Sequence, residues 1–226
     1  MYTAWLKCPM SVMFDKIKRI RIAEPPNLHF VKGDRVHKAA EAYIAVPGKK
    51  APPVIPELAA VKGHLELFRK LRAQTERDWA FTRAFEPASW FGPDAWLRVK
   101  VDVCAVEPGP PQLVRITDWK TGKVYDDHRQ QRSLYALGGL QMAELGLLPG
   151  VAKTPDLKLK AEHLYTDTTQ SATEVFALKG LPALKREWAV RIKQMMTDTR
   201  YPARTGFHCR YCKFRKSNGG PCPEDQ

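Results

Sequence analysis

The sequence predicts an α/β fold in which a small mixed β-sheet is flanked by helices. Residues 96–103 and 113–120 each alternate apolar and polar side chains with period two, which is typical of strands. Apolar residues at helical spacing precede and follow this pair, and a second pair of strand-like segments comes later. The order helix, strand pair, helix, strand pair, helix favours a sheet covered by helices.

Each element is predicted from a local pattern. The turn at 107–111 separates the first two strands, and the Pro- and Gly-rich segment 46–53 predicts a loop. Apolar spacing and end signals predict a helical stretch at 30–41, a helix at 56–82, an irregular segment at 85–92, a helix at 126–145, strands at 157–166 and 174–178, and a helix at 181–199.

Length and charge narrow the class of protein. The chain has 226 residues, which suits one domain, and 44% of them are hydrophobic, which is ample for a core. Lys and Arg number 37 against 24 Asp and Glu, so the formal net charge is +13. Such a surplus attracts a polyanion through its phosphates, with strong salt dependence, although soluble basic proteins without such a partner also carry it.

Two acids and one lysine on the first strand pair are the most informative residues. Asp118 and Lys120 are two positions apart, so both side chains leave the same face of the sheet. Asp102 is expected on the opposite face from Leu97, Val99, Val101 and Val103. Pairing the strands brings two carboxylates and one ammonium together. Carboxylates suit a hydrated Mg²⁺ or Mn²⁺, and a neighbouring lysine can orient a water and offset phosphate charge.

The neighbouring segments add residues of the same kind. Thr-Gly-Lys at 121–123 predicts a turn but lacks the Gly-rich run of a phosphate-binding loop. In the next helix Gln131 and Tyr135 are one turn apart and share a face. His37 lies in the first helical stretch and, taken alone, is an ordinary surface or core histidine.

Taken in order, these residues resemble a known family. Gly33 with His37, then Asp102, then Asp-Trp-Lys-Thr-Gly-Lys at 118–123, then Gln131 with Tyr135 resemble the PD-(D/E)XK nuclease superfamily. More narrowly, they are similar to the RecB-type branch, which includes AddB and the CRISPR-adaptation exonucleases, and a phage-type exonuclease is a variant of the same resemblance. The resemblance covers most of the chain and implies a restriction-endonuclease-like core.

The resemblance also implies roles for the site residues. His37, Asp102 and Asp118 would hold Mg²⁺ or Mn²⁺. Lys120 would be the catalytic lysine, acting with the two aspartates. Glu76 is a further candidate, because the branch often has an acidic residue before the first of these strands.

The resemblance extends to the helix after the site, and it has one exception at Trp119. Gln131 and Tyr135 would contact DNA or support the site. The family more usually has tyrosine or another residue where this chain has Trp119. Trp119 should point away from the site face, so we expect a packing change.

Five cysteines predict a second metal site independently. With neither a signal peptide nor a membrane-spanning segment in the sequence, we expect a cytoplasmic chain, in which clustered thiols indicate metal rather than disulfides. Cys209 and Cys212 form a Cys-x-x-Cys pair, and Gly219 and Gly220 free the backbone to deliver Cys222. Free thiols in a disordered tail are the alternative.

Closure of that site by the other chain end resembles the iron–sulfur nucleases of the same branch, in which a cluster joins the two termini. The implied ligands are Cys8, Cys209, Cys212 and Cys222, and the implied cofactor is a [4Fe–4S] cluster. Nine residues separate Cys212 from Cys222, more than is usual, so Zn²⁺ held by four cysteines, or by three and His208, is the alternative. Cys104, in a strand, is interpreted as a small buried residue.

The sequence therefore predicts one nuclease domain over 1–226, in which 201–226 and Cys8 form a metal-cluster subregion. The predicted activity is a metal-dependent DNA exonuclease acting in recombination, repair or end processing. The partners would be DNA, single-stranded or with free ends, and a helicase, annealing protein or integrase, but no membrane. Candidates for stacking on single-stranded bases are Trp5, Trp79, Trp90, Phe91 and Trp96. A noncatalytic nucleic-acid-binding module and a metal-stapled structural protein remain alternatives.

Overall fold

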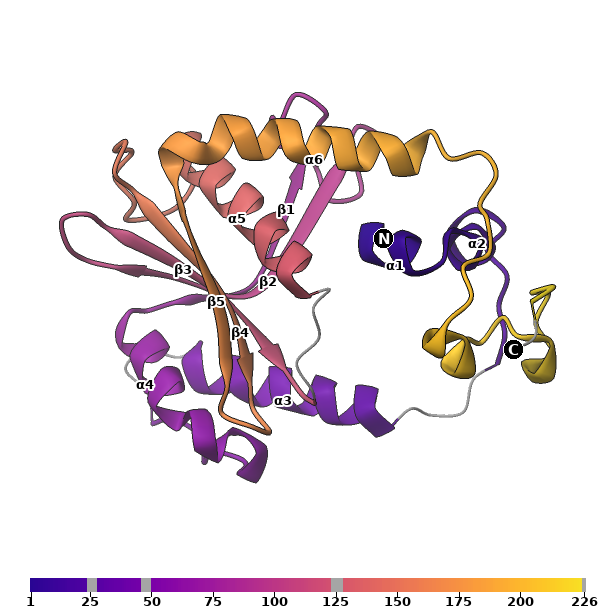
Figure 1. Ribbon diagram of the computed structural model, residues 1–226. Helices are drawn as coiled ribbons and strands as arrows, with labels where there is room; N and C mark the ends of the chain where they lie inside the picture. Colours follow the sequence, from indigo (N-terminus) through magenta and orange to yellow (C-terminus); the bar gives the residue numbers. More distant parts are fainter. Residues whose placement is uncertain (24–27, 46–49, 123–127, 225–226) are drawn as a thin grey trace. The chain divides into compact units, whose positions relative to one another are not determined.

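The computed structural model describes residues 1–23, 28–45, 50–122 and 128–224 of the chain (Figure 1). Its contacts divide the chain into two compact units. Unit 1 comprises Met1–Asn27 and Arg186–Gln226, and unit 2 comprises Leu28–Lys185. The single domain over 1–226 stays a prediction beside this division.

Unit 2 contains a five-stranded mixed sheet, which confirms the predicted fold class. The strands lie in the order β1 (Gln74–Phe81), β2 (Leu97–Glu107), β3 (Leu113–Lys120), β4 (Lys158–Tyr165), β5 (Ser171–Ala177). Strands β3 and β4 are parallel, and the other neighbours are antiparallel. A parallel pair needs a crossover connection, which helix α5 (His128–Glu144) supplies.

Helices cover both faces of this sheet. Helices α3 (Leu28–Ile44) and α4 (Lys62–Lys70) lie on one face, and α5 lies on the other (Figure 1). A 3-10 turn, η2 (Pro56–Val61), leads into α4, and another, η3 (Leu178–Gly180), leads into helix α6 (Leu181–Met196). The chain passes from unit 2 back into unit 1 within α6.

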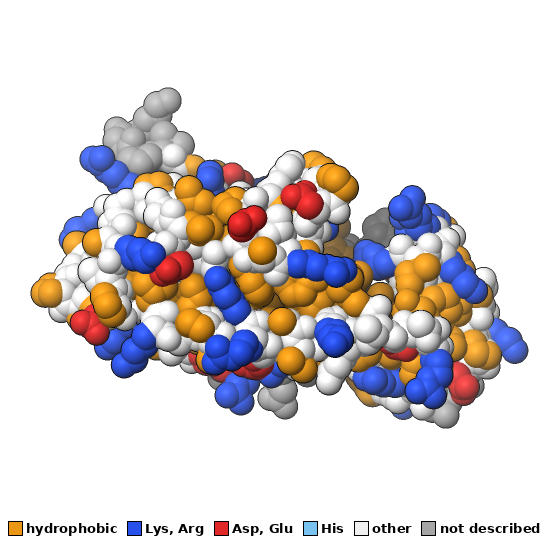
Figure 2. Space-filling view, turned by 90° about the horizontal axis from the view of Figure 1, so that it is seen from above, with side chains coloured by type: hydrophobic (Ala, Val, Ile, Leu, Met, Phe, Trp, Pro, Cys, Tyr) orange, Lys and Arg blue, Asp and Glu red, His pale blue; other side chains and the backbone are white. Residues whose placement is uncertain are grey.

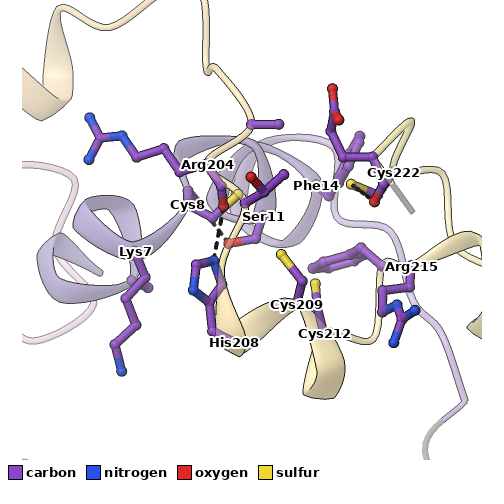
Figure 3. A pocket seen from close by; sticks show the side chains of 15 residues that line it. Lys7, Cys8, Ser11, Phe14, Arg204, His208, Cys209, Cys212, Arg215 and Cys222 are labelled. Carbon is purple, nitrogen blue, oxygen red and sulfur yellow. Dashed lines mark hydrogen bonds between the residues drawn. The ribbon is translucent and has the colours of Figure 1, made fainter. Parts of the chain in front are cut away.

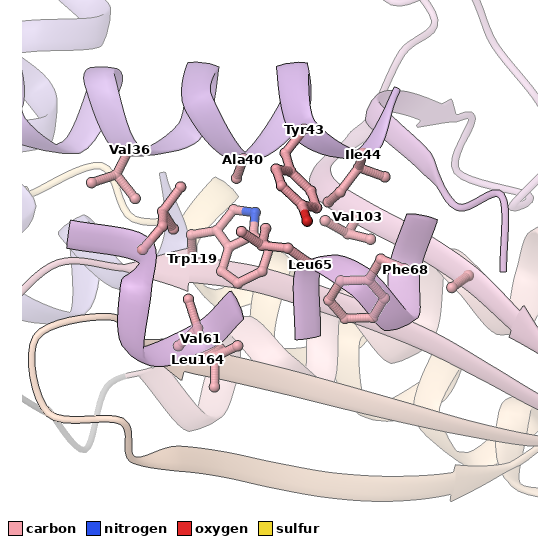
Figure 4. Close-up of a cluster of buried hydrophobic side chains, with 12 residues drawn as sticks. Val36, Ala40, Tyr43, Ile44, Val61, Leu65, Phe68, Val103, Trp119 and Leu164 are labelled. Carbon is pink, nitrogen blue, oxygen red and sulfur yellow. The ribbon is translucent and has the colours of Figure 1, made fainter. Parts of the chain in front are cut away.

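A hydrophobic cluster fills the space between the sheet and helices α3 and α4 (Figure 4). Trp119 of β3 is 2% exposed and meets the ring of Phe68 edge-on, with centroids 6.0 Å apart. Trp119 therefore packs under α3 and α4 and points away from the face of Asp118 and Lys120, as its position in the alternation predicted. The cluster also contains Val36, Ala40, Tyr43, Ile44, Leu58, Val61, Leu65, Val103, Ala105 and Leu164.

Two glycines let α5 approach the opposite face of the sheet closely. A Cβ atom on Gly139 would lie 2.5 Å from the Cδ1 atoms of Ile116 and Leu159. A Cβ atom on Gly138 would lie 3.2 Å from Val99 Cγ2. This close packing brings the start of α5, which carries Gln131 and Tyr135, beside the end of β3.

The expected helix at 56–82 is wrong in its second half, which forms β1. Helix α4 ends at Lys70, and Arg72 adopts a left-handed backbone with φ of 53°. Strand β1 then pairs with β2 along its length and buries Trp79, Ala80 and Phe81. Apolar spacing in this stretch fits either structure, and only pairing with β2 selects the strand.

A second expectation is also wrong, namely that one face of strand β2 carries Leu97, Val99, Val101 and Val103 together. Val99 lies against Gly138 of α5, whereas Val103 belongs to the cluster under α3 and α4. The period-two alternation of β2 is therefore interrupted between them, next to Asp102.

Other predicted elements lie within a few residues of the observed ones. Strand β3 has the predicted bounds, and β2, β4, β5, α5 and α6 differ from prediction at their ends. Residues 46–49 of the expected loop, Lys123 of the expected turn and residues 126–127 of the expected helix lie outside the described residues.

Unit 1 joins the two ends of the chain. Its N-terminal part contains α1 (Tyr2–Lys7), α2 (Pro9–Val12) and the π-helical turn η1 (Met13–Ile17), and its C-terminal part contains the 3-10 turns η4 (Phe207–Tyr211) and η5 (Lys216–Asn218). The Trp5 indole N–H donates to Asp198 at 2.8 Å, and Arg204 donates to the Leu6 carbonyl at 2.7 Å. Among the described helices of both units, none is long and apolar enough to cross a membrane.

Candidate functional site

The site begins where strands β2 and β3 separate. Their ladder ends at the pair Val103 and Thr117, so Asp102 and Asp118 are the next residues on the two strands. The Asp102 carboxylate accepts a hydrogen bond from the backbone N–H of Trp119 at 2.8 Å. This bond holds the buried carboxylate at the fork between the strands.

Helix α3 brings His37 to this fork. Its Nδ1 lies 3.3 Å from Asp102 Oδ2, and its Nε2 lies 3.1 Å from the Trp119 carbonyl oxygen, to which it donates. Gly33, one turn earlier, faces Thr121, whose Oγ1 would be 3.7 Å from an added Cβ. That distance is ordinary van der Waals contact, so Gly33 places the helix next to the strand end that carries the site.

The protonation of His37 and Asp102 reflects their surroundings. The hydrogen bond to Asp102 raises the pKa of His37 above its ordinary value of 6.5. Burial, followed by the nearby charge of Asp118, raises the pKa of Asp102 despite its bond to His37. A bound cation would relieve this repulsion between the two carboxylates, since it favours the charged form of both.

Glu76 completes a compact group of ligand atoms. Its position in the register of β1 faces Asp102 of β2, and its carboxylate lies 2.9 Å from Lys100 Nζ. Ligand atoms of His37, Glu76 and Asp102 all lie within 4.8 Å of one another. Glu76 has a left-handed backbone, with φ of 48°, an uncommon and strained conformation that turns up often at functional sites.

Asp118 is held by its own set of donors beside this group. The Tyr135 hydroxyl donates to Asp118 Oδ1 at 2.5 Å, and Gln131 donates to the Tyr135 oxygen at 2.5 Å. Lys120 Nζ lies 2.5 Å from Asp118 Oδ2. Burial raises the pKa of Tyr135 well above its ordinary value, so the hydroxyl keeps its proton as a donor.

Two residues of this site were not among those that the sequence indicated. His163 of β4 is fully buried, its Nε2 lies 3.9 Å from Asp118 Oδ2, and burial lowers its pKa to about 3. Arg132 of α5 lies 3.2 Å from its other ring nitrogen. A histidine within a predicted strand was the available signal, but its partner depends on the parallel register that pairs His163 with Asp118.

The donor set fits a hard divalent cation. Two carboxylates and an imidazole are ligands that Mg²⁺ or Mn²⁺ accepts, and octahedral ligands at about 2.1 Å from the metal lie about 3–4 Å apart. The group of His37, Glu76 and Asp102, with its limit of 4.8 Å, is close to that spacing. Asp118 adjoins it, since its charge acts on both His37 and Asp102. The structure thus brings together all the sequence-predicted residues of this site, with Glu76 in a central position.

The cysteines form a second group, entirely within unit 1. Four cysteine side chains line a pocket of about 190 Å³, together with His208 and the apolar rings of Phe14 and Phe214 (Figure 3). They are Cys8, Cys209, Cys212 and Cys222. Burial raises the pKa of Cys212, and the nearby sulfurs of the other three add to this effect. Cys104 is buried in β2, and burial raises its pKa to about 12, which suits an inert core thiol.

The spacing of these sulfurs is relevant to the ligand they would hold. In the part of the chain that the structure describes, no three of the four sulfurs lie within 4.8 Å of one another. Zinc with Zn–S bonds of about 2.3 Å requires its sulfurs about 3.8 Å apart. In a four-iron cluster each sulfur binds a different iron, so the sulfurs lie further apart.

The fold and the first site together define a class of protein. A mixed sheet that carries two aspartates, a glutamate and a lysine at one strand fork, with a histidine brought in by helix α3, is suited to metal-dependent phosphodiester hydrolysis. A family model described as the PD-(D/E)XK nuclease superfamily matches residues 2–217. The chain therefore belongs to this superfamily, which indicates a metal-dependent nuclease with DNA as its substrate.

Comparisons with individual proteins add little more. No curated protein matches the chain. Among solved structures, one titled "Crystal structure of SSO0001" is similar, with a TM-score of 0.43 and 12% sequence identity, covering 100% of this chain and 85% of that chain.

Proposed function

We propose that this chain is an exonuclease that hydrolyses phosphodiester bonds at DNA ends with Mg²⁺ or Mn²⁺, acting in recombination, repair or end processing. The observation that carries the proposal is the group of His37, Glu76 and Asp102 within 4.8 Å, beside Asp118 and Lys120. Together these residues supply metal ligands and a cation for one phosphate. The helicase, annealing protein or integrase expected as partner belongs to the same proposal.

Each residue has a distinct role in this mechanism. His37, Glu76 and Asp102, with Asp118, would hold the metal, which when bound supplies a Lewis acid at the phosphate. Lys120 would orient the attacking water and offset negative charge as the water oxygen bonds to phosphorus and the bond to the leaving sugar oxygen breaks. The water would give one proton to solvent, and the leaving oxygen would take one from solvent, so the step balances as hydrolysis. Tyr135 and Gln131 would keep Asp118 in place through the bonds at 2.5 Å.

Removing the lysine or the aspartate tests this mechanism. Lys120→Ala and Asp118→Ala should each abolish cleavage of end-labelled single- and double-stranded DNA in Mn²⁺ while leaving DNA binding largely intact. The matched control is Lys62→Ala, which removes an exposed cation from helix α4. Unchanged cleavage in either test variant would contradict the mechanism. A wild-type chain that binds DNA with a steep salt dependence and never cuts it would favour the noncatalytic alternative.

Exposure ranks the aromatic candidates for contact with single-stranded bases. Trp5 and Trp79 are 8% and 4% exposed, so neither offers a free ring face. Phe91, in the loop between β1 and β2, is 90% exposed. We infer that Phe91 is the first candidate for base stacking, while Lys and Arg side chains such as those visible in Figure 2 attract the phosphates.

We further propose that Cys8, Cys209, Cys212 and Cys222 hold a [4Fe–4S] cluster, and that they and residues 201–226 form a metal-cluster subregion of one nuclease domain. The four thiols that line one pocket match the four thiolate ligands of such a cluster. Their apolar surroundings, with Phe14 and Phe214 in the pocket lining, suit a cluster shielded from water. The cluster would link the two chain ends within unit 1.

Metal analysis distinguishes the two ligands. Protein purified without oxygen should be brown, with about four iron atoms per chain and visible absorption that Cys212→Ser removes. Cys104→Ser is the matched control, because Cys104 is buried in β2 and does not line this pocket. Colourless protein with one zinc per chain would replace the cluster with the zinc alternative.

A further inference from the structure

A buried imidazole faces Asp118 from the neighbouring strand. His163 is 0% exposed, and the parallel register of β3 and β4 pairs it with Asp118. His163 Nε2 and Asp118 Oδ2 are 3.9 Å apart. Both atoms are buried; within the described residues His163 Nε2 has no hydrogen-bond partner, and Asp118 Oδ2 is ion-paired with Lys120 Nζ at 2.5 Å. Leaving a buried ring nitrogen unbonded is costly, so its place beside this carboxylate needs a reason.

Arg132 determines which atom of the imidazole carries the proton. Its Nη1 lies 3.2 Å from His163 Nδ1. A guanidinium only donates hydrogen bonds, so Nδ1 must be the acceptor and the ring proton must sit on Nε2. The N–H bond is therefore directed at Asp118. Glu174 holds Arg132 in turn, at 3.5 Å from Nη2.

Aromatic neighbours fix the plane of the ring. His128 and Tyr135 both meet the His163 ring edge-on, at centroid distances of 5.3 Å and 6.0 Å. His128 also lies 2.7 Å from the Tyr165 hydroxyl. The imidazole is thus held on three sides and has one open polar direction, toward Asp118.

We propose that His163 is a positioning residue that takes over Asp118 Oδ2 from Lys120 when the site binds metal and DNA. Lys120 Nζ lies 2.5 Å from that oxygen and cannot at the same time face the water and phosphate. When the lysine turns to the phosphate, a small movement of the carboxylate closes the 3.9 Å gap to a hydrogen bond from His163. The carboxylate then keeps its orientation toward the metal, held by His163 on one oxygen and Tyr135 on the other. This inference depends on the proposed metal site.

Two substitutions of His163 separate positioning from packing. His163→Leu fills the space without a donor, whereas His163→Gln keeps an N–H near the place of Nε2. We expect His163→Leu to weaken Mn²⁺ binding by about 10- to 100-fold, with little change in KM for DNA, as for other residues that orient a metal ligand. His163→Gln should recover most of this loss, and a merely structural residue would not show that recovery. His64→Leu, on α4, is the matched control.

Mn²⁺ binding to the full chain, followed by electron paramagnetic resonance without DNA, is measured beside the cleavage rate. Wild-type affinity in His163→Leu, with normal cleavage, overturns the inference and leaves the proposed function standing. A second outcome is that Mn²⁺ binding weakens in His163→Leu and recovers in His163→Gln, while the unaltered chain does not cleave DNA. That outcome supports the inference and overturns the nuclease proposal. If circular dichroism shows that His163→Leu does not fold, Arg132→Met provides the same test. Without the Arg132 guanidinium, the proton of His163 can sit on Nδ1 and Nε2 no longer has to donate to Asp118. Wild-type Mn²⁺ affinity in that variant overturns the inference too.

Discussion

The two candidate metal sites differ in what holds their ligands. In unit 2 the ligands stand on long elements, with His37 on α3, Asp102 on β2 and Asp118 on β3, and protein hydrogen bonds fix each side chain. In unit 1 the cysteines come from short turns and coil. In the described part the Phe214 backbone bonds to the Cys212 sulfur, and Cys222 Sγ donates to the Glu224 carbonyl at 3.6 Å. We therefore expect the first site to be preorganised without metal and the second to depend more on metal for its order.

This difference predicts different responses to damage. Loss of one ligand in the strand-borne site should remove chemistry and leave the fold, since the sheet and its helices pack without metal. Loss of the metal in the cysteine site should loosen unit 1, since its cysteines stand on short turns with local backbone hydrogen bonds and not on a sheet. The following changes test that contrast, from the largest expected effect to the smallest.

Glu76→Gln should have the largest effect on activity. It removes a charged ligand from the group with His37 and Asp102, so cleavage in Mn²⁺ should fall by about 10²-fold or more. Asp78→Asn, two positions along the same strand, is the matched control and should keep wild-type rates. Rates are followed on end-labelled DNA. A fall in the iron or zinc content of the Glu76 variant would contradict the independence of the two sites.

Gly220→Ala should damage the cysteine site and spare the other. An added Cβ would lie 2.2 Å from the Phe214 carbonyl carbon, which is backbone and cannot turn away. The Cys222 N–H donates to the Phe214 carbonyl at 2.9 Å, so the cysteine must shift as well. We expect a stability loss of about 1–3 kcal/mol in thermal unfolding, and iron or zinc per chain reduced by half or more. Gly180→Ala, where an added Cβ meets nothing within 4 Å, is the control. Full metal content in Gly220→Ala would contradict this prediction.

Metal affinity at the acidic site should rise with pH. The bond to Asp102 raises the pKa of His37 above 6.5, and a proton on this ring competes with the metal. Mn²⁺ should therefore bind about tenfold more weakly for each pH unit below that raised pKa, and reach full affinity above it. In metal-free protein the pH dependence of folding stability has the opposite sign to that of metal affinity. The proton on His37 contributes stability that is fully present below pH 6.5 and is lost as the pH rises through the raised pKa. Titration calorimetry measures the affinity for Mn²⁺ over a range of about pH 5.5 to about pH 8.5, which spans the ordinary pKa of histidine. A flat profile would exclude His37 as a ligand.

Gly63→Ala should have the smallest effect and the opposite sign. Gly63 lies in helix α4 with nothing within 4 Å of an added Cβ, so the substitution should stabilise the helix by about 1 kcal/mol. Thermal unfolding should shift upward while cleavage and metal content stay unchanged. A change in either metal site would mean that the two regions are coupled through the sheet.

Local pattern predicted most of the sheet but not its first strand. Strand β3 has the predicted bounds, because turn-forming residues border the strand-like segment 113–120 on both sides. Strand β1 was expected as helix, because its apolar residues also fit helical spacing and its pairing with β2 is a long-range contact. Glu76 was a candidate site residue by resemblance alone, and its place opposite Asp102 follows only from the pairing of β1 with β2.

The amino-acid sequence by itself determined which chemical groups are present and their order: the histidine, the acids, the lysine, the Gln131 and Tyr135 pair, and the four cysteines. Side-chain chemistry and period-two alternation are local properties, so reading along the chain suffices for them. Only the tertiary structure decided that Glu76 meets His37 and Asp102, and that His163 with Arg132 supports Asp118. Those contacts depend on strand register and on how closely α5 packs on the sheet, and both arise from interactions between residues far apart in the chain.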